Sequence, residues 1–235
     1  MLSEWLLWAR GPMFRFAIAL MALGMLRLMV LSALNLAAVA RRSGDKRFPF
    51  AAVLRRTAGW LVPRRDALNG QPVFTLSSVV FHLAMIITPV FLGAHIMLWQ
   101  RGLGLSWPAL TQPLADALTL AGIVTGLVLI VQRILARSSR DLSRFQDYLL
   151  PVLVTIIFAT GYLAMHPGSD PLPYETVMLI HVVGGNLLLI LLPFTKLSHA
   201  LLFPITRLVS EMGWHLAPDA GHRVAVALHK EDEPI

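Results

Sequence analysis

The chain has 235 residues, of which 56% are hydrophobic and only 14% are charged, with a mean hydropathy of +0.67. A soluble domain usually carries about 25% charged residues, so this composition excludes an ordinary soluble protein and predicts an integral membrane protein. Cysteine is absent, which excludes disulfides and iron–sulfur clusters held by this chain. The net charge of +7 does not indicate nucleic acid, because the basic residues lie beside the hydrophobic runs, where they set topology and meet anionic lipid.

Five hydrophobic runs are long enough to cross a bilayer, which takes about 20 apolar residues each. We therefore expect an all-α membrane protein, with a five-helix bundle in residues 1–208 and a polar cytoplasmic tail in residues 209–235. The stretch Met1 to Arg10 lacks the small-residue cleavage pattern of a signal peptide. The expected spans are residues 13–40, 74–99, 114–135, 146–165 and 174–204.

Lys and Arg are distributed unevenly between the connections. The connections after the first and third spans are basic, whereas those after the second and fourth carry almost no Lys or Arg. By the positive-inside rule the N-terminus is expected outside and the C-terminus in the cytoplasm. Arg10 and Arg15 depart from this rule, since they fall on the outer side. The basic residues are Arg41, Arg42, Lys46, Arg47, Arg55, Arg56, Arg64 and Arg65 after the first span, and Arg133, Arg137, Arg140 and Arg144 around the third connection.

Four histidines lie in otherwise apolar runs: His82 and His95 in the second, His181 and His199 in the last. The expected topology matches His82 in depth with His199 toward the cytoplasm, and His95 with His181 toward the outside. Neutral imidazole is a common axial ligand of haem iron, so each pair could hold one haem. For a single histidine the alternative is a packed polar residue that is hydrogen-bonded to a neighbouring helix. Two depth-matched pairs favour the ligand interpretation, because polar residues are costly in a bilayer.

Helical phase differs between the two runs. His181 and His199 are eighteen residues apart, so a straight helix would place them on one face, about 27 Å apart. His82 and His95 are thirteen residues apart, which on a straight helix is about 140° out of phase and about 20 Å along the axis. The two-haem interpretation therefore requires a distortion at Pro89, between the latter two.

Four further residues are candidates for supporting roles. Lys196 could pair with a haem propionate or extend to the interface as a helix-end lysine. Arg27 lies in the middle of the first span and needs a carboxylate or backbone partner, for which a propionate is one candidate. Asp116 opens the third span next to the expected place of His95. It could accept a proton from quinol, or it could be an acid placed in the first helical turn, where the helix dipole favours negative charge. His166 is either a surface residue or an alternative outer ligand.

Several short motifs carry a family resemblance. The chain resembles the gamma (cytochrome b) subunit of respiratory nitrate reductases, and looks still closer to the related cytochrome b subunits of sulfite-reductase-associated and heterodisulfide-reductase-like membrane complexes. It departs from the nitrate reductase subunits in a longer spacing between the two histidines of span two. It also has Asp116 where they have a lysine implicated in quinol binding. The resemblance covers about residues 74–208 and is carried by Phe81-His82, Gly93-Ala94-His95, His181 and the run Pro-Phe-Thr-Lys-Leu-Ser-His ending at His199, with Pro204 five residues beyond.

The resemblance implies a five-span haem b protein of a bacterial or archaeal inner (cell) membrane. Such a subunit passes electrons between membrane quinone and a cytoplasmic iron–sulfur or molybdoenzyme partner, and has no substrate chemistry beyond quinone. His82 and His199 would ligate the inner haem iron, and His95 and His181 the outer one, with two haems expected and one as the alternative. The rival interpretations are a haem-free membrane anchor or assembly subunit, and a small transporter that uses its histidines for protons.

Overall fold

The computed structural model describes residues 1–42, 50–59, 69–168, 172–213 and 220–232. In these residues the chain is α-helical with short π and 3₁₀ turns and no strand, which confirms the expected all-α class. Five of the described helices are long and apolar enough to cross a membrane, so the chain is a multi-pass membrane protein. They cover Leu2–Ala38, Pro72–Phe91, Gln112–Leu135, Phe145–Met165 and Tyr174–Phe194.

Internal contacts divide the chain into two units, which are described separately. The first unit comprises Met1–Ala22 and Arg65–Thr195, and the second comprises Leu23–Arg64 and Lys196–Ile235. This grouping does not test the expected boundary at residue 208, which stays a prediction. The grouping decides which candidate site residues can be compared in position. His82, His95 and His181 belong to the first unit, and His199 belongs to the second.

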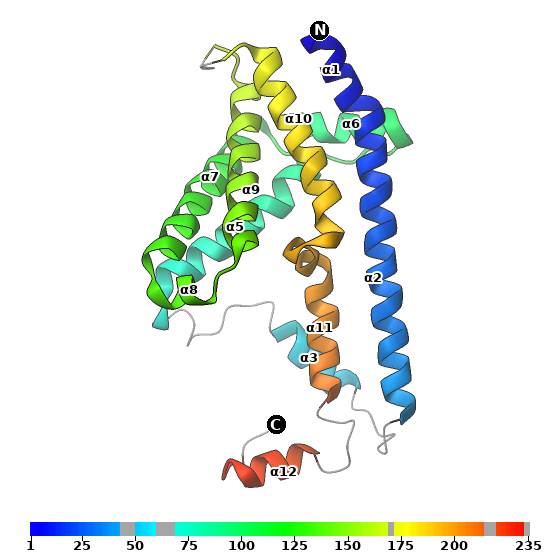
Figure 1. Cartoon of the computed structure of the whole chain (residues 1–235), viewed down its shortest axis with the longest axis vertical. Coiled ribbons are helices and arrows are strands. Elements are labelled where there is room, and N and C mark those ends of the chain that lie inside the picture. The colour runs from blue at the N-terminus through cyan, green and yellow to red at the C-terminus, as the bar shows by residue number, and fades with distance from the viewer. Residues whose placement is uncertain (43–49, 60–68, 169–171, 214–219, 233–235) are drawn as a thin grey trace. The chain divides into compact units, whose positions relative to one another are not determined.

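The first unit is a row of membrane helices in which each packs against the next (Figure 1). Helix α5 packs against α7, α7 against α9, and α9 against α10, while α1 and the π-helix η1 pack against α10. The elements are α1 (Leu2–Trp8), η1 (Ala9–Met13), the start of α2 (Phe14–Arg42), α5 (Pro72–Phe91), α6 (Gly93–Leu103), α7 (Gln112–Leu135), α8 (Arg137–Leu142), α9 (Phe145–Met165), α10 (Tyr174–Leu191) and the 3₁₀ turn η2 (Leu192–Phe194).

The second unit contains the rest of α2 and a set of shorter helices. Among these, α11 packs against α3. The elements are α3 (Phe50–Gly59), the 3₁₀ turn η3 (Lys196–Ser198), α11 (His199–Gly213) and α12 (Ala220–Ala227).

Small residues on α7 allow its neighbours to approach closely. A Cβ atom added at Gly122 would lie 2.7 Å from Cε1 of Phe158 on α9, and one at Gly126 would lie 2.4 Å from Oγ1 of Thr155. The spacing Gly-x-x-x-Gly is typical of close helix packing in membranes. The glycines therefore fix α7 between α5 and α9, around a core of Phe81, Ala84, Val154 and Phe158.

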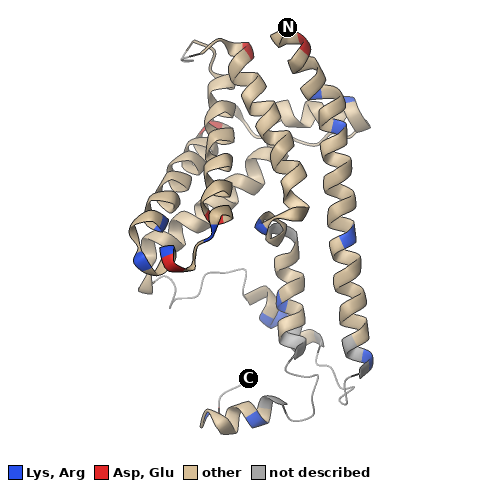
Figure 2. Cartoon of the chain, viewed as in Figure 1, with Lys and Arg blue, Asp and Glu red and all other residues tan. Residues whose placement is uncertain are grey.

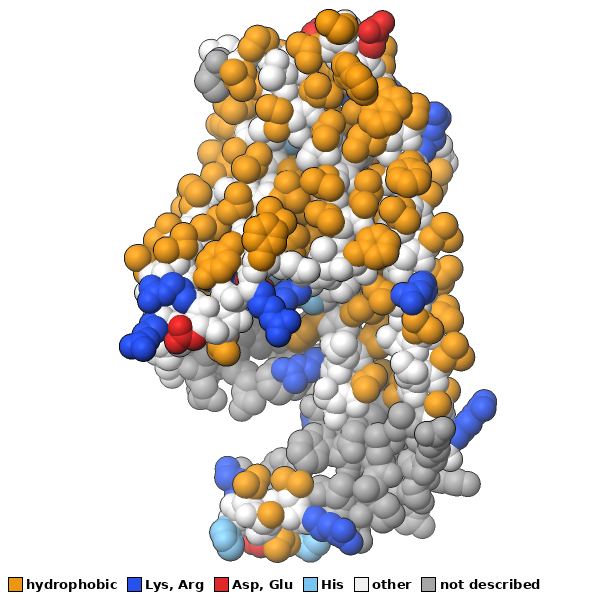
Figure 3. Space-filling view, in the orientation of Figure 1, with side chains coloured by type: hydrophobic (Ala, Val, Ile, Leu, Met, Phe, Trp, Pro, Cys, Tyr) orange, Lys and Arg blue, Asp and Glu red, His pale blue; other side chains and the backbone are white. Residues whose placement is uncertain are grey.

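The surface of this bundle is apolar between charged ends. The side chains exposed along the middle of α7 are hydrophobic (Leu120, Val124, Leu127 and Val131), and the space-filling view shows the hydrophobic cover of the unit (Figure 3). Lys and Arg gather at the connection α7–α8–α9 (Figure 2). An apolar surface is favourable in contact with lipid chains, so these helices are suited to contact the bilayer directly.

The last hydrophobic run is interrupted, contrary to the expectation of one span through Pro204. Helix α10 ends at Leu191, a 3₁₀ turn follows, and Thr195 is extended before His199 begins α11. Pro193 explains the interruption, because proline has no N–H to donate and its ring clashes with the carbonyl of the preceding turn. A straight helix through Pro204, on which the expected phase of His181 and His199 depended, is therefore not present.

Candidate functional site

Helix α5 continues past Pro89 and breaks at Leu92. Leu92 has an extended backbone (φ −72°, ψ 127°), and α6 starts at Gly93. The helix therefore continues through Pro89, where the distortion was expected, and breaks three residues later. Because α6 is a separate helix, the 140° phase difference between His82 and His95, which was calculated for one straight helix, no longer applies.

The break leaves backbone carbonyls at the end of α5 without partners on the next helical turn, as at every helix C-terminus. The carbonyl of Thr88 still accepts the helical bond from Leu92, and each of the last three carbonyls accepts a hydrogen bond from His95 or from the loop before α7. One of these donors is the imidazole of His95. The donors are Leu92 N to Thr88 O (2.9 Å), His95 Nδ1 to Pro89 O (3.0 Å), Trp107 Nε1 to Val90 O (2.9 Å) and Leu110 N to Phe91 O (2.9 Å).

His181 lies on α10 and its ring faces α9. Its Nδ1 donates to the carbonyl of Ile157 at 2.9 Å and is 3.4 Å from the Thr160 hydroxyl. The ring packs against the backbone at Gly161, where an added Cβ would lie 2.8 Å from Cε1 of the imidazole. Glycine at this position therefore leaves the space that the ring occupies, and the carbonyl one turn earlier fixes the ring's orientation.

The two imidazoles lie together. The ring centres of His95 and His181 are 6.0 Å apart and the ring planes differ by 12°. A carbonyl oxygen only accepts, so each ring carries its proton on Nδ1, and Nε2 of the neutral ring keeps its lone pair. Metal-ligating histidines usually donate their second nitrogen to a carbonyl or carboxylate in this way.

The separation of the two ring centres matches that of two imidazoles bound to one metal ion. A metal–imidazole bond of about 2 Å on each side, and about 1 Å from nitrogen to ring centre, gives ring centres about 6 Å apart. In the described part of the chain no group of three or more His, Cys, Asp or Glu side chains could hold a metal ion. A haem needs only two protein ligands, because the macrocycle supplies the others.

Arg10 is a residue of this site that the sequence interpretation missed. It lies on η1, which packs against α10 and which Asn186 of α10 holds through a 2.8 Å hydrogen bond to the carbonyl of Ala9. Among the described residues, no carboxylate oxygen lies within 4.0 Å of its guanidinium. The signal that could have found it is its departure from the positive-inside rule.

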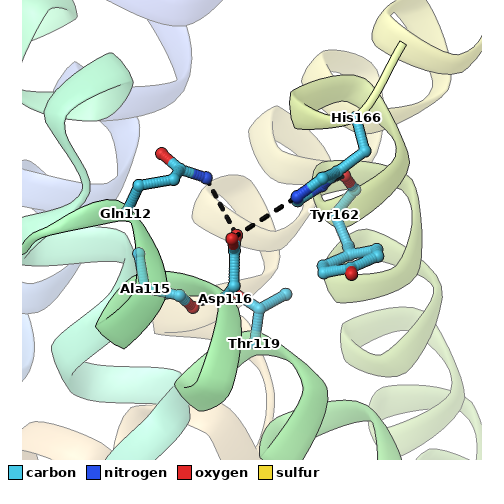
Figure 4. A network of polar contacts seen from close by, with 6 residues as sticks. All are labelled: Gln112, Ala115, Asp116, Thr119, Tyr162 and His166. Atoms are coloured by element: carbon cyan, nitrogen blue, oxygen red, sulfur yellow. Dashed lines mark hydrogen bonds and ion pairs between the residues drawn. The ribbon is translucent and has the colours of Figure 1, made fainter. Parts of the chain in front are cut away.

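Asp116 lies in a polar network between α7 and the end of α9 (Figure 4). Its carboxylate accepts a hydrogen bond from Gln112 Nε2 at 2.9 Å, and its Oδ2 is 3.4 Å from Nε2 of His166. His166 donates from Nδ1 to the carbonyl of Tyr162 at 2.8 Å and lies against the Tyr162 ring. The contact between Nε2 and Oδ2 therefore joins the two side chains in one polar network.

Two sequence interpretations of this region change. Asp116 is the fifth residue of α7, which begins at Gln112, and no acidic residue occupies the first turn. A helix-dipole role for Asp116 is therefore weak, since that effect falls off within the first turn. His166 is engaged with Asp116, which argues against its use as an alternative outer ligand.

The remaining predicted site residues are divided between the two units, so each is described within its own unit. His82 is half-buried on α5 and donates from Nδ1 to the carbonyl of Ser78 at 2.7 Å. His199, at the start of α11, makes the same kind of contact with the carbonyl of Lys196. Arg27 is exposed on α2, and Lys196 is exposed on η3. His199, Lys196 and Arg27 all belong to the second unit, so the inner haem pair and both propionate contacts stay predictions.

Comparisons with known proteins add a likeness but no function. A curated protein from Nitratidesulfovibrio vulgaris (strain Hildenborough), whose name states no activity, is 36% identical to this chain over 150 residues. The match covers 63% of this chain and 65% of that protein, so the chain spans slightly less than two thirds of its relative. No family model matches the chain, and no solved structure matches it. The chain is thus similar to a protein of N. vulgaris, and its assignment to a cytochrome b family stays a proposal.

Proposed function

We propose that the chain is a di-haem cytochrome b subunit that transfers electrons between membrane quinone and a cytoplasmic iron–sulfur or molybdoenzyme partner of a respiratory complex. The observation that carries the proposal is the His95–His181 pair. Two imidazoles from different helices lie 6.0 Å apart, and each is oriented by a backbone carbonyl that fixes the proton on Nδ1. Packing alone does not require both rings to keep Nε2 available.

The chain's own residues have separable tasks in this function. His95 and His181 hold the outer haem, whose iron supplies one-electron chemistry when it is bound. His82 and His199 would hold the inner haem, and Lys196 and Arg27 would pair with propionates. The break at Leu92 positions His95, and Gly161 gives the His181 ring its space.

Asp116 and His166 serve as the proton acceptor for quinol. Oxidation of a quinol to a quinone releases two electrons and two protons, so a base is required near the point of oxidation. The two side chains are about one quarter to one third exposed (26% and 32%), which allows a proton to leave toward water.

The experiment follows haem reduction by quinol. The purified chain is mixed anaerobically with a reduced short-chain naphthoquinol or benzoquinol, and the haem α-band is recorded by stopped-flow absorbance. We expect quinol to reduce the wild-type haem, and His181→Ala to remove one spectral component. The matched control is His222→Ala, an exposed histidine on α12, which should behave as wild type. A wild-type chain without haem would support the membrane-anchor interpretation instead.

A further inference from the structure

Arg10 is a cation at an unusual place in this protein. It lies in the first helix, at the end that the distribution of Lys and Arg assigns to the outside. Its side chain is half-buried, whereas Arg15, five residues further along the same helix, is exposed. An arginine that only reaches for water or lipid headgroups would be expected to resemble Arg15.

The backbone around Arg10 is held in a defined position. The turn Ala9–Met13 is a π-helix that contains Pro12, and such π-bulges occur frequently at functional sites. Ala9 is fully buried, and its carbonyl accepts the hydrogen bond from Asn186, which is 2% exposed. Asn186 lies five residues after His181 on α10, so the same helix positions both the outer ligand and the turn that carries Arg10.

The guanidinium lacks a counter-charge in the described part of the chain. No carboxylate oxygen of the described residues lies within 4.0 Å of it. A half-buried arginine is costly unless an anion or hydrogen-bond acceptors compensate it. The described carboxylate nearest in sequence is that of Glu4, which lies 3.7 Å from the N-terminal ammonium group. The compensating anion is therefore expected to come from a bound molecule.

We propose that Arg10 binds an anionic oxygen group of the ligand held between His95 and His181, which for a haem is a propionate. The inference rests on the proposed function. It assigns to the outer haem a cation that stands apart from Lys196 and Arg27, and it explains why a basic residue is found on the outer side. The competing source of an anionic oxygen is a lipid phosphate.

The test is a potentiometric titration of the haems in Arg10→Gln, Arg10→Lys and the control Arg15→Gln, with haem counted per chain in each. The outer haem is the spectral component that His181→Ala removes. A nearby cation destabilises the ferric state, which carries one more positive charge than the ferrous state. We therefore expect Arg10→Gln to lower the midpoint potential of the outer component, and Arg10→Lys and Arg15→Gln to leave it close to wild type.

The outcomes separate this inference from the proposed function. Two haems with an unshifted outer potential in Arg10→Gln would overturn the role of Arg10 and leave the cytochrome intact, while a wild-type chain without haem would overturn both.

The titration is done in lipid vesicles and in phosphate-free maltoside detergent; a shift that disappears in detergent assigns Arg10 to lipid phosphate and overturns the inference. If Arg10→Gln loses both haems, Arg10→Lys decides: a wild-type outer potential supports the inference, and loss of both haems contradicts it.

Discussion

The substitution Gly161→Ala tests the geometry of the outer histidine pair. The added Cβ would lie 2.8 Å from Cε1 and 3.2 Å from Nδ1 of His181. The ring must therefore move by at least 0.6 Å, the difference between 2.8 Å and the 3.4 Å at which ordinary contact begins. Overpacking of this kind costs about 1–3 kcal/mol, and weakening of the 2.9 Å bond to Ile157 costs about 1 kcal/mol more. The better helix propensity of alanine offsets about 1 kcal/mol.

The net cost of about 1–3 kcal/mol corresponds to haem binding that is roughly 5- to 150-fold weaker at the outer site. The assay is haem retained per chain after gel filtration of the purified protein, together with the reduced-minus-oxidised spectrum. Gly185→Ala is the matched control, because a Cβ at Gly185 on α10 would meet nothing within 4 Å. If Gly161→Ala and Gly185→Ala retain the same haem with the same spectrum, the ring of His181 does not depend on the space at Gly161 and the reasoning fails.

Three further predictions use other parts of the first unit. Asp116→Asn should slow quinol oxidation severalfold while the haem spectrum stays normal, because an amide cannot take up the proton; unchanged stopped-flow kinetics would contradict the proton-acceptor role. Asn186→Ala removes the bond to the carbonyl of Ala9 and should cost about 1–3 kcal/mol, seen as faster proteolysis near the N-terminus; wild-type cleavage rates would count against this anchor. Gly126→Ala places a methyl group 2.4 Å from the Thr155 hydroxyl oxygen and should lower the unfolding temperature in detergent, which is measured by circular dichroism.

Periodicity and composition were sufficient to predict the architecture of the bundle. The apolar runs predict five spans, and the described helices confirm them. Span ends were less accurate, because hydrophobicity continues across positions where the backbone changes direction. The second run illustrates this: residues 92–99 remain apolar, yet α5 ends at Phe91. In the last run, Pro193 was visible in the sequence, but the phase of His181 and His199 was calculated for a straight helix.

The outer pair could be proposed from the sequence, but its geometry could not. Pro89 indicated a distortion, whereas the break at Leu92 is stabilised by groups far along the chain. The indole N–H of Trp107 and the backbone N–H of Leu110 bond to carbonyls freed at the end of α5. Such long-range hydrogen bonds have no periodic signature. The carbonyl acceptor of His181, on Ile157 of another helix, is equally invisible in sequence.

The electrostatic partners of two residues could also not be predicted from the sequence. Asp116 was placed beside the expected position of His95, but the structure pairs it with His166 across the ends of α7 and α9. Both residues are near span ends on the same side of the expected topology, so the pairing is compatible with the sequence without being specified by it. The position of Arg10 on the outer side, against the positive-inside rule, marks it as unusual. Nothing in the sequence, however, connects Arg10 with His181.

The central claim is tested most directly by counting haem b per chain, with the pyridine haemochrome assay on the purified wild-type protein and on His181→Ala and His199→Ala. The account predicts two haems in the wild type and one in each variant, with different spectral components lost from the two. One haem that only His181→Ala removes would keep the outer site and refute the inner pair. A wild-type chain that carries no haem would contradict the account and leave a membrane anchor as its function.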